Sequence, residues 1–122
     1  MIDSKELQRK LANKGIQVVD DGRTIWVTIP RLRLPPQFYP TETRLLIEYP
    51  KYGGEPKAYV DRRLRLRKGS QLVPSRHLPE CLTPRWLLER GYVYVCMRIE
   101  SPNVEFEDFL VALKRWLEGL RE

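Results

Sequence analysis

The segment from Arg44 to Asp61 constrains the fold of this chain more than any other. An apolar run leads into Tyr49-Pro50, Gly53-Gly54 and Pro56 follow, and a second strand pattern begins at Lys57. Proline has no N–H to donate to a sheet ladder, so each of the two prolines must end a strand or lie outside one. The segment therefore predicts two strands joined by a short, stiff connection.

The residues before this segment predict a helix and a hairpin. Asp3 is a candidate N-cap, and Gly15 is a natural C-terminal stop for a short helix. Strand patterns then cover 16–19 and 24–29, and the Asp-Gly pair between them is a strong hairpin signal. Residues 30–40 hold four prolines, which predicts an extended connector.

After Asp61, arginine alternates with leucine over 62–68, a pattern that would prolong the preceding strand with one basic face. Residues 69–80 read as a loop. A short helical turn is expected over 82–88, with Thr83 as its cap and Pro84 in its first position. Residues 92–99 predict a strand. An amphipathic helix follows Ser101, and its broad apolar face requires cover by the sheet.

Length and composition predict one domain with its own hydrophobic core, over 122 residues. No stretch approaches the roughly 20 apolar residues of a membrane span, and the first residues lack signal-peptide character. A cytoplasmic protein without a membrane partner is therefore expected. The two cysteines are too few for a disulfide framework and are expected to be free thiols.

The net charge of +6 is concentrated in residues 31–76, where 11 Lys/Arg face 4 Asp/Glu, a local net charge of +7. Such a block suits nucleic acid or an acidic protein partner. A solvated, arginine-rich surface explains it equally well.

Few catalytic arrangements fit the sequence. With one histidine, His77, and two cysteines, a four-ligand zinc site would need carboxylates at unconvincing spacing. There is no glycine-rich phosphate loop, so neither a metal nor a cofactor is expected. Cys81 is the favoured nucleophile, because nearby arginines and His77 would favour its thiolate. Cys96 is the alternative nucleophile. Without a chemical role, Cys81 would be an ordinary loop cysteine and Cys96 a small residue buried in the core.

The element order, with Tyr49-Pro50 and Pro56, resembles the ubiquitin-conjugating enzyme superfamily (UBC/RWD-like), including its bacterial or archaeal conjugating-enzyme-like proteins. The family's Tyr-Pro-x-x-x-Pro element maps to these residues with two extra residues between the prolines. Catalytic members carry His-Pro-Asn before a thioester-forming cysteine and a leucine. This chain has His77-Leu78-Pro79 and then Cys81-Leu82, without the asparagine. Val95-Cys96-Met97 matches the family's Ile-Cys-Leu segment.

The resemblance implies one α+β domain of the UBC-like fold over residues 1–122. Its parts would be an N-terminal helix, an antiparallel four-strand meander, a later strand, and a C-terminal amphipathic helix packed on the sheet. It also implies that Cys81 carries a ubiquitin-like protein as a thioester and transfers it to an amine, with His77 nearby. An activating enzyme would contact the basic face of the first helix, which consists of Lys5, Arg9, Lys10 and Lys14.

Two non-enzymatic functions remain open from the sequence. Many members of the superfamily lack the cysteine and only bind ubiquitin-like or other proteins, so a non-catalytic protein-binding module is the first. The second is a basic nucleic-acid-binding domain that uses Arg63, Arg65 and Arg67. Phosphate contacts at these arginines would make binding strongly salt-dependent. Whether the chain is an enzyme is left open by the sequence.

Overall fold

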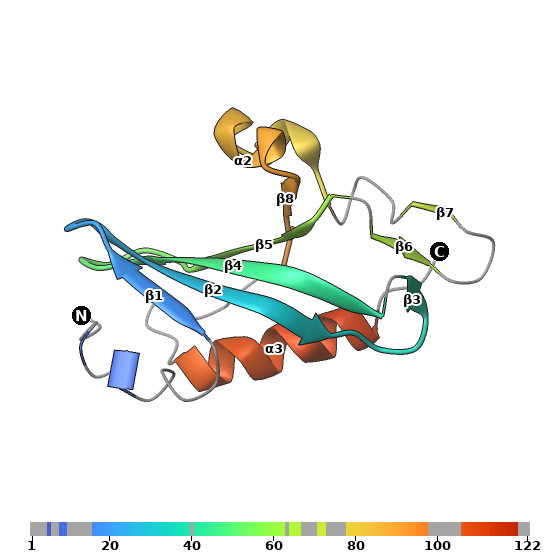
Figure 1. Cartoon of the computed structure of the whole chain (residues 1–122), viewed down its shortest axis with the longest axis horizontal. Helices are drawn as coiled ribbons and strands as arrows, with labels where there is room; N and C mark the ends of the chain where they lie inside the picture. The colour runs from blue at the N-terminus through green and yellow to red at the C-terminus, as the bar shows by residue number, and fades with distance from the viewer. Residues whose placement is uncertain are drawn as a thin grey trace.

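The computed structural model describes residues 5, 8–9, 16–39, 41–62, 64–66, 71–72, 78–97 and 106–119. Its main feature is a five-stranded antiparallel sheet, with a three-stranded sheet at one end (Figure 1). In spatial order the large sheet consists of β1 (Gln17–Asp20), β2 (Thr24–Arg33), β4 (Glu42–Pro50), β5 (Lys57–Asp61) and β8 (Tyr92–Tyr94). The small sheet consists of β3 (Phe38–Tyr39), β6 (Arg65–Leu66) and β7 (Gln71–Leu72).

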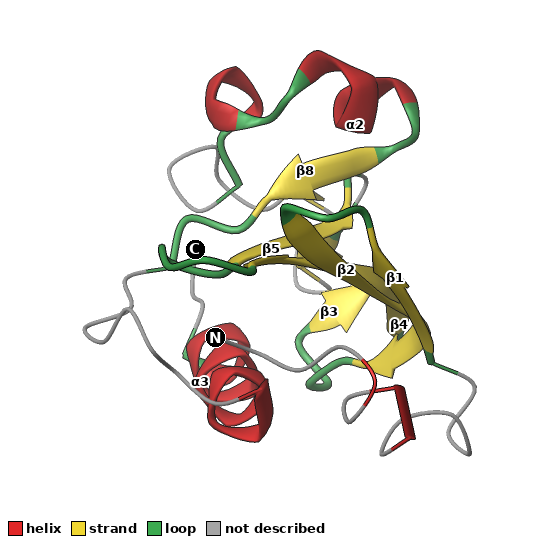
Figure 2. Ribbon diagram, turned by 90° about the vertical axis from the view of Figure 1, so that its left-hand side faces the viewer, coloured by secondary structure: helices red, strands yellow, loops and turns green. Residues whose placement is uncertain are grey.

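The long helix α3 (Phe106–Glu118) lies against one face of the large sheet (Figures 1 and 2). Successive residues of a strand point to opposite faces, so the apolar residues at every second position form one buried surface. The helix supplies apolar residues at a spacing of four, which places them on one side of α3. Together they form the main core, which includes Ile25, Val27, Leu45, Ile47, Phe109, Leu113 and Leu117. The predicted C-terminal helix and its cover by the sheet are confirmed.

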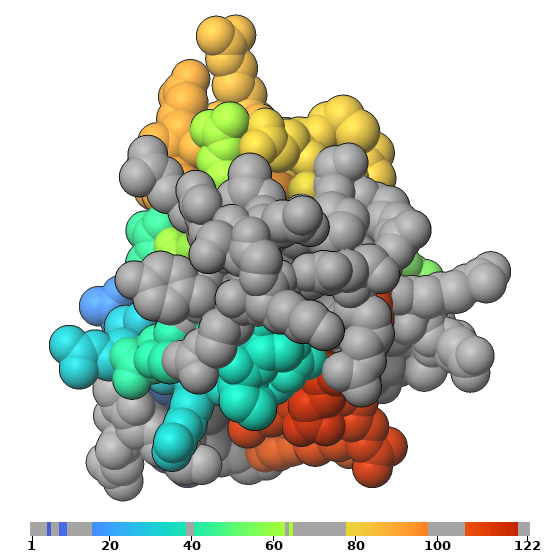
Figure 3. Space-filling view, turned by 90° about the vertical axis from the view of Figure 1, so that its right-hand side faces the viewer, coloured from blue at the N-terminus to red at the C-terminus, as the bar shows by residue number. Residues whose placement is uncertain are grey.

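The opposite face of the sheet is covered in part by a 3-10 turn, η2 (Glu80–Leu82), and the short helix α2 (Arg85–Glu89). A smaller buried cluster lies beneath them and contains Leu46, Tyr59, Leu87 and Tyr92. Figure 3 shows the η2–α2 segment and α3 at opposite ends of the molecule. The large sheet thus has an α3 face and an α2 face, and η2 and α2 cover only part of the α2 face.

The two turns predicted from local sequence signals are confirmed. Gly22 has a φ of 95° in the turn between β1 and β2, a conformation that glycine adopts at little cost. The neighbouring Asp21 carboxylate accepts hydrogen bonds from the backbone N–H groups of Arg23 and Thr24, at 2.9 and 2.7 Å. β4 ends at Pro50, and β5 begins directly after Pro56. Proline therefore stands at the end of one strand and just before the other, as expected.

The predicted UBC-like fold is wrong. In place of a four-strand meander with a separate later strand, β8 is hydrogen-bonded beside β5 as the fifth strand of one sheet, with Tyr59 opposite Tyr94. In the described part of the chain, the helices with defined bounds are α2 and α3. Of the predicted first helix, Lys5, Gln8 and Arg9 are described, and the rest lies outside the described residues. Pairing between distant strands depends on burial, which the element order does not reveal.

The proline-rich connector is also different from the prediction. β2 continues through Pro30 to Arg33, with a shift in its register to β4 between Ile29 and Leu32. A bulge leaves a residue without a ladder bond, so proline is tolerated there. The side chains alternate between the two faces beyond the bulge, since Leu32 and Leu34 are buried and Arg31 and Arg33 are exposed.

The strand expected to continue from Asp61 ends there. The chain turns at Arg62, and β6 joins the small sheet beside β3. β7 lies in the segment predicted to be loop, and β8 covers only Tyr92–Tyr94 of the strand predicted over 92–99. Among the described residues, the structure contains no helix long and apolar enough to span a membrane.

Candidate binding groove

A groove of about 280 Å³ lies on the α2 face of the sheet. Trp26, Thr28 and Leu46 come from β2 and β4, where Thr28 stands opposite Leu46. Val19 of β1 stands opposite Trp26 and extends the groove to the edge of the sheet. The groove therefore follows the part of this face that α2 leaves uncovered.

The wall opposite β1 and β2 comes from the α2 segment and β8. It is formed by Trp86 and Leu87 of α2, by Arg90 just after the helix, and by Tyr92 of β8. Leu87 is fully buried and fixes α2 on the sheet, whereas Trp86, one residue earlier, is 45% exposed. The Leu87 side chain thus packs into the small core, and the neighbouring Trp86 side chain lines the groove.

Two tryptophans meet in the groove. The rings of Trp26 and Trp86 are in an edge-to-face arrangement, with centroids 5.6 Å apart and an interplanar angle of 78°. Such a pair contributes about 0.5–1.5 kcal/mol beyond the area that it buries. The indole N–H of Trp26 donates to the Asp21 carboxylate at 3.1 Å. Both rings are therefore held in place. Trp86 nevertheless remains open to solvent, as does Val19, whose exposed fraction is 57%.

Among the described residues that line the groove, Arg90 is the one that carries a charge. Its guanidinium lies over the ring of Trp86, 5.4 Å from the centroid, a distance typical of a cation–π contact. In the part of the chain that the structure describes, no carboxylate forms an ion pair with Arg90. The groove is consequently apolar and aromatic, with a positive charge on the α2 side.

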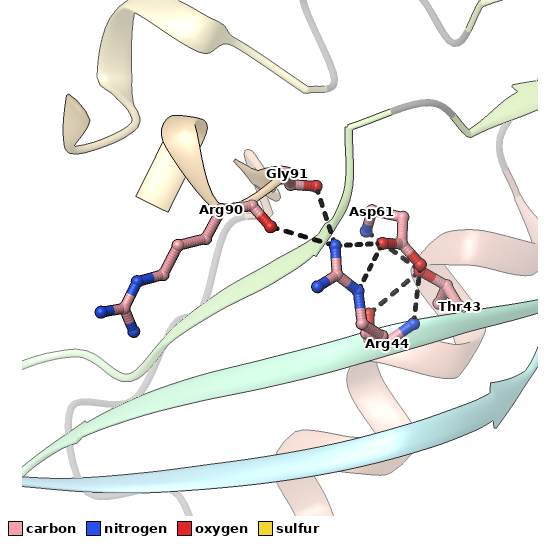
Figure 4. A network of polar contacts seen from close by, with 5 residues as sticks. All are labelled: Thr43, Arg44, Asp61, Arg90 and Gly91. Carbon is pink, nitrogen blue, oxygen red and sulfur yellow. Dashed lines mark hydrogen bonds and ion pairs between the residues drawn. The ribbon is translucent and has the colours of Figure 1, made fainter. Parts of the chain in front are cut away.

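A polar network fixes the end of α2 to the sheet (Figure 4). The Arg44 guanidinium donates to the backbone carbonyls of Arg90 and Gly91 at 3.2 and 3.4 Å. It pairs with the Asp61 carboxylate at 2.7 Å and lies 4.5 Å from the ring centre of Tyr92. One arginine of β4 thereby connects β5, the α2 segment and β8.

Asp61 is itself held by β4. Its second carboxylate oxygen accepts from the Arg44 backbone N–H at 2.9 Å and is 3.0 Å from the hydroxyl of the buried Thr43. Gly91 has a φ of 85°, and a Cβ added there would lie 2.9 Å from Arg44 Nη2. The positive φ and the closeness of the Arg44 side chain both favour glycine at this position.

Thr83 has a different role from the predicted helix cap. α2 begins after Pro84 without a side-chain cap bond. The Thr83 hydroxyl donates to the Pro79 carbonyl and accepts from the Tyr94 backbone N–H, both at 2.9 Å. It therefore joins η2 to β8 at the edge of the sheet.

Both predicted nucleophiles are free and exposed. Cys81 lies in η2, beside Leu82, which is 61% exposed. Cys96 lies two residues beyond the end of β8. The pKa of Tyr94 is raised, chiefly by burial and to a smaller extent by the nearby Cys96 and Glu55. Exposure excludes the buried-core interpretation of Cys96.

Most other predicted site residues cannot be placed. Lys5 and Arg9 are exposed, and Arg65 is described only through the backbone of β6. Among the described residues, no group of three or more His, Cys, Asp or Glu could hold a metal ion. His77, Lys10, Lys14, Arg63 and Arg67 lie outside the described residues, so the nucleic-acid surface stays a prediction.

The groove itself was not predicted. One signal was available: Trp26 alternates with the core residues Ile25 and Val27, which places a large aromatic ring on the other face of β2. The contact of this ring with Trp86, which lies 60 positions later in the sequence, depends on the placement of α2. Comparisons of the chain with family models, curated proteins and solved structures found no match. The groove and the exposed cysteines are the features of the described residues that bear on function.

Proposed function

We propose that this chain is a protein-binding module that takes an apolar side chain of a partner protein into the groove between β1, β2 and α2. The exposed Trp86 beside Trp26 is the observation that carries the proposal. Tryptophan, tyrosine and arginine are the residues that most often dominate the energy of protein interfaces, and the groove contains all three types.

The groove has the features of a preformed binding site. Trp26 is fixed by Asp21, and the α2 segment is tied to the sheet through Arg44. A site that is already ordered loses little conformational entropy when a partner binds. Burial of one aliphatic or aromatic side chain contributes about 1.5–3 kcal/mol, which is less than the roughly 8 kcal/mol of a micromolar complex. The partner must therefore also contact the surface around the groove.

Selection from a peptide library displayed on phage, with the full chain as bait, tests this proposal. Peptides that bind the wild type are expected to bind Trp86→Ala at least tenfold more weakly, as is typical of a hot-spot tryptophan. Val111→Ala is the matched control, because Val111 is 48% exposed but lies on α3. Val19→Lys supplies a second groove variant at an exposed position of β1.

The result is decided by comparison of the variants, after circular dichroism has shown that each is folded. Loss of binding in both groove variants and its retention in Val111→Ala supports the proposal. The proposal fails if no peptide is enriched, or if the enriched peptides bind the groove variants and the wild type equally well.

The predicted conjugating activity is a second candidate, and the exposure of both thiols favours it. Without the UBC-like fold, its remaining support is the exposure of Cys81 next to Leu82 and the family-like residues around both cysteines. Such an activity implies a cytoplasmic protein, where the thiols stay reduced. Its partners would be a ubiquitin-like protein and its activating enzyme.

Incubation with an activating enzyme, ATP and a ubiquitin-like protein tests the second candidate. A thiol-sensitive adduct that is lost in Cys81→Ser and retained in Cys96→Ser is expected if Cys81 is the nucleophile. The reverse pattern would assign the reaction to Cys96. If the adduct persists in the double variant, a thioester on either cysteine is ruled out.

A further inference from the structure

We infer that the partner segment carries a carboxylate next to its apolar anchor, and that Arg90 binds this carboxylate. The inference rests on the proposed function, since it concerns the same groove. It names the ligand class as an acidic peptide segment with an exposed leucine, phenylalanine or tryptophan.

Arg90 is available to bind an anion. Its guanidinium lies over the face of Trp86, and a guanidinium placed over an aromatic face still has N–H donors along its edge for another partner. Carboxylates suit this planar, multi-donor edge. By contrast, Arg85 already faces Glu89 at 3.5 Å, and Arg62 faces Glu80 at 3.0 Å.

Two acidic residues that face Trp26 are already engaged by other groups. The Asp21 carboxylate accepts from the backbone N–H groups of its own turn and from Trp26, and these hydrogen bonds lower its pKa. Glu48, which stands opposite Trp26 on β4, accepts from the Tyr59 hydroxyl at 3.2 Å. These carboxylates, from the β1–β2 turn and from β4, place negative charge on the sheet side of the groove. A carboxylate of the ligand is therefore favoured on the α2 side.

The backbone that carries Arg90 is fixed before binding. Arg44 donates to the Arg90 carbonyl, and Asp61 holds Arg44 in turn. Only the Arg90 side chain has to be ordered when the ligand arrives. The positive net charge of the chain, +6, would also favour encounter with an acidic segment.

Two matched series of synthetic peptides test the inference. Each peptide contains one central leucine, phenylalanine or tryptophan; it is flanked by Asp or Glu in the first series and by Asn or Gln in the second. The acidic series is expected to bind about three- to fivefold more tightly, which is the upper part of the range for a solvent-exposed ion pair. Added salt should reduce this preference, because it screens exposed charges.

Variants of two arginines locate the effect. Arg90→Gln should abolish the preference for acidic peptides, and Arg90→Lys should keep part of it. Arg85→Gln is the control, because it removes the same charge from α2 at a position that already has an ionic partner. It should leave the preference unchanged.

The possible outcomes separate the inference from the proposed function. If both series bind equally well and both lose binding in Trp86→Ala, the groove binds peptides but the inference is overturned. If the preference persists in Arg90→Gln, another cation is responsible and the inference is likewise overturned. If neither series binds, although library selection yields groove-dependent peptides, the named ligand class is wrong. Failure of library selection as well would overturn the proposed function.

Discussion

Replacement of Asp61 by asparagine should destabilise the protein through the network that holds α2. The carboxylate receives four contacts: the Arg44 guanidinium provides two at one oxygen, and the Arg44 backbone N–H and Thr43 hydroxyl meet the other. An amide has one acceptor oxygen and one donor nitrogen. Whichever way it is turned, its N–H₂ group faces donors of Arg44, so about half of these contacts are lost.

The expected loss is about 2–3 kcal/mol in the free energy of unfolding. Two hydrogen bonds contribute about 1 kcal/mol each. The ion pair adds at most about 1 kcal/mol, because solvent screens the partly exposed Arg44 side chain. The backbone carbonyls of Arg90 and Gly91 keep their donor only if Arg44 stays in place, so the end of α2 should loosen as well. Peptide binding in the groove should weaken in parallel.

Equilibrium urea unfolding followed by tryptophan fluorescence measures this loss, with an unchanged slope as the sign of two-state behaviour. The control is Glu80→Gln, which makes the same chemical change in an Arg62 pair that is about half exposed on both sides. That change should cost less than about 1 kcal/mol. If Asp61→Asn costs no more than Glu80→Gln, the network does not have the assigned role.

Three further predictions follow from particular contacts. Gly91→Ala should cost about 1–2 kcal/mol more than Gly22→Ala, measured by thermal unfolding. Both glycines have positive φ, but only at Gly91 would the new Cβ meet Arg44; equal losses would contradict this. Thr83→Val should cost about 1–2 kcal/mol in urea unfolding, because it removes the hydroxyl between η2 and β8; an unchanged midpoint would exclude this role. Burial raises the pKa of Tyr59 above its ordinary value of 10.0. Above that pH the unfolded chain therefore loses a proton that the folded state keeps, and stability should fall by about 1.4 kcal/mol per pH unit. Tyr59→Phe should reduce this slope in urea unfolding between about pH 10 and 12, and an unchanged slope would refute the assignment.

The elements of the fold that could be predicted are those specified by adjacent residues. Asp20-Asp21-Gly22 predicted the hairpin, and the prolines at 50 and 56 placed the boundaries of β4 and β5. The helical spacing of Phe109, Leu113 and Leu117 predicted α3 and its buried face. Each signal acts over a few residues, through backbone φ, missing N–H groups or side-chain periodicity.

The errors arose where structure depended on distant partners. The proline-rich segment continues as strand because a shift in register against β4 accommodates Pro30. Thr83 was expected to cap a helix, but its hydroxyl accepts a hydrogen bond from the Tyr94 backbone N–H instead. Both candidate cysteines were identified from the sequence, and their exposure became known only from the structure.

The sequence by itself determined the β1–β2 hairpin, the boundary of β4 and β5 at the two prolines, and the amphipathic helix, because these follow from local propensity and periodicity. The tertiary structure decided that β8 joins β5 and that α2 covers only part of the outer face. It also decided that Trp26 meets Trp86 and that Arg44 reaches the Arg90 carbonyl, 46 residues away. Contacts at such separation form only when the burial of both partners outweighs the entropy of ordering the chain between them. For this reason the groove is a property of the folded chain, although each of its residues is visible in the sequence.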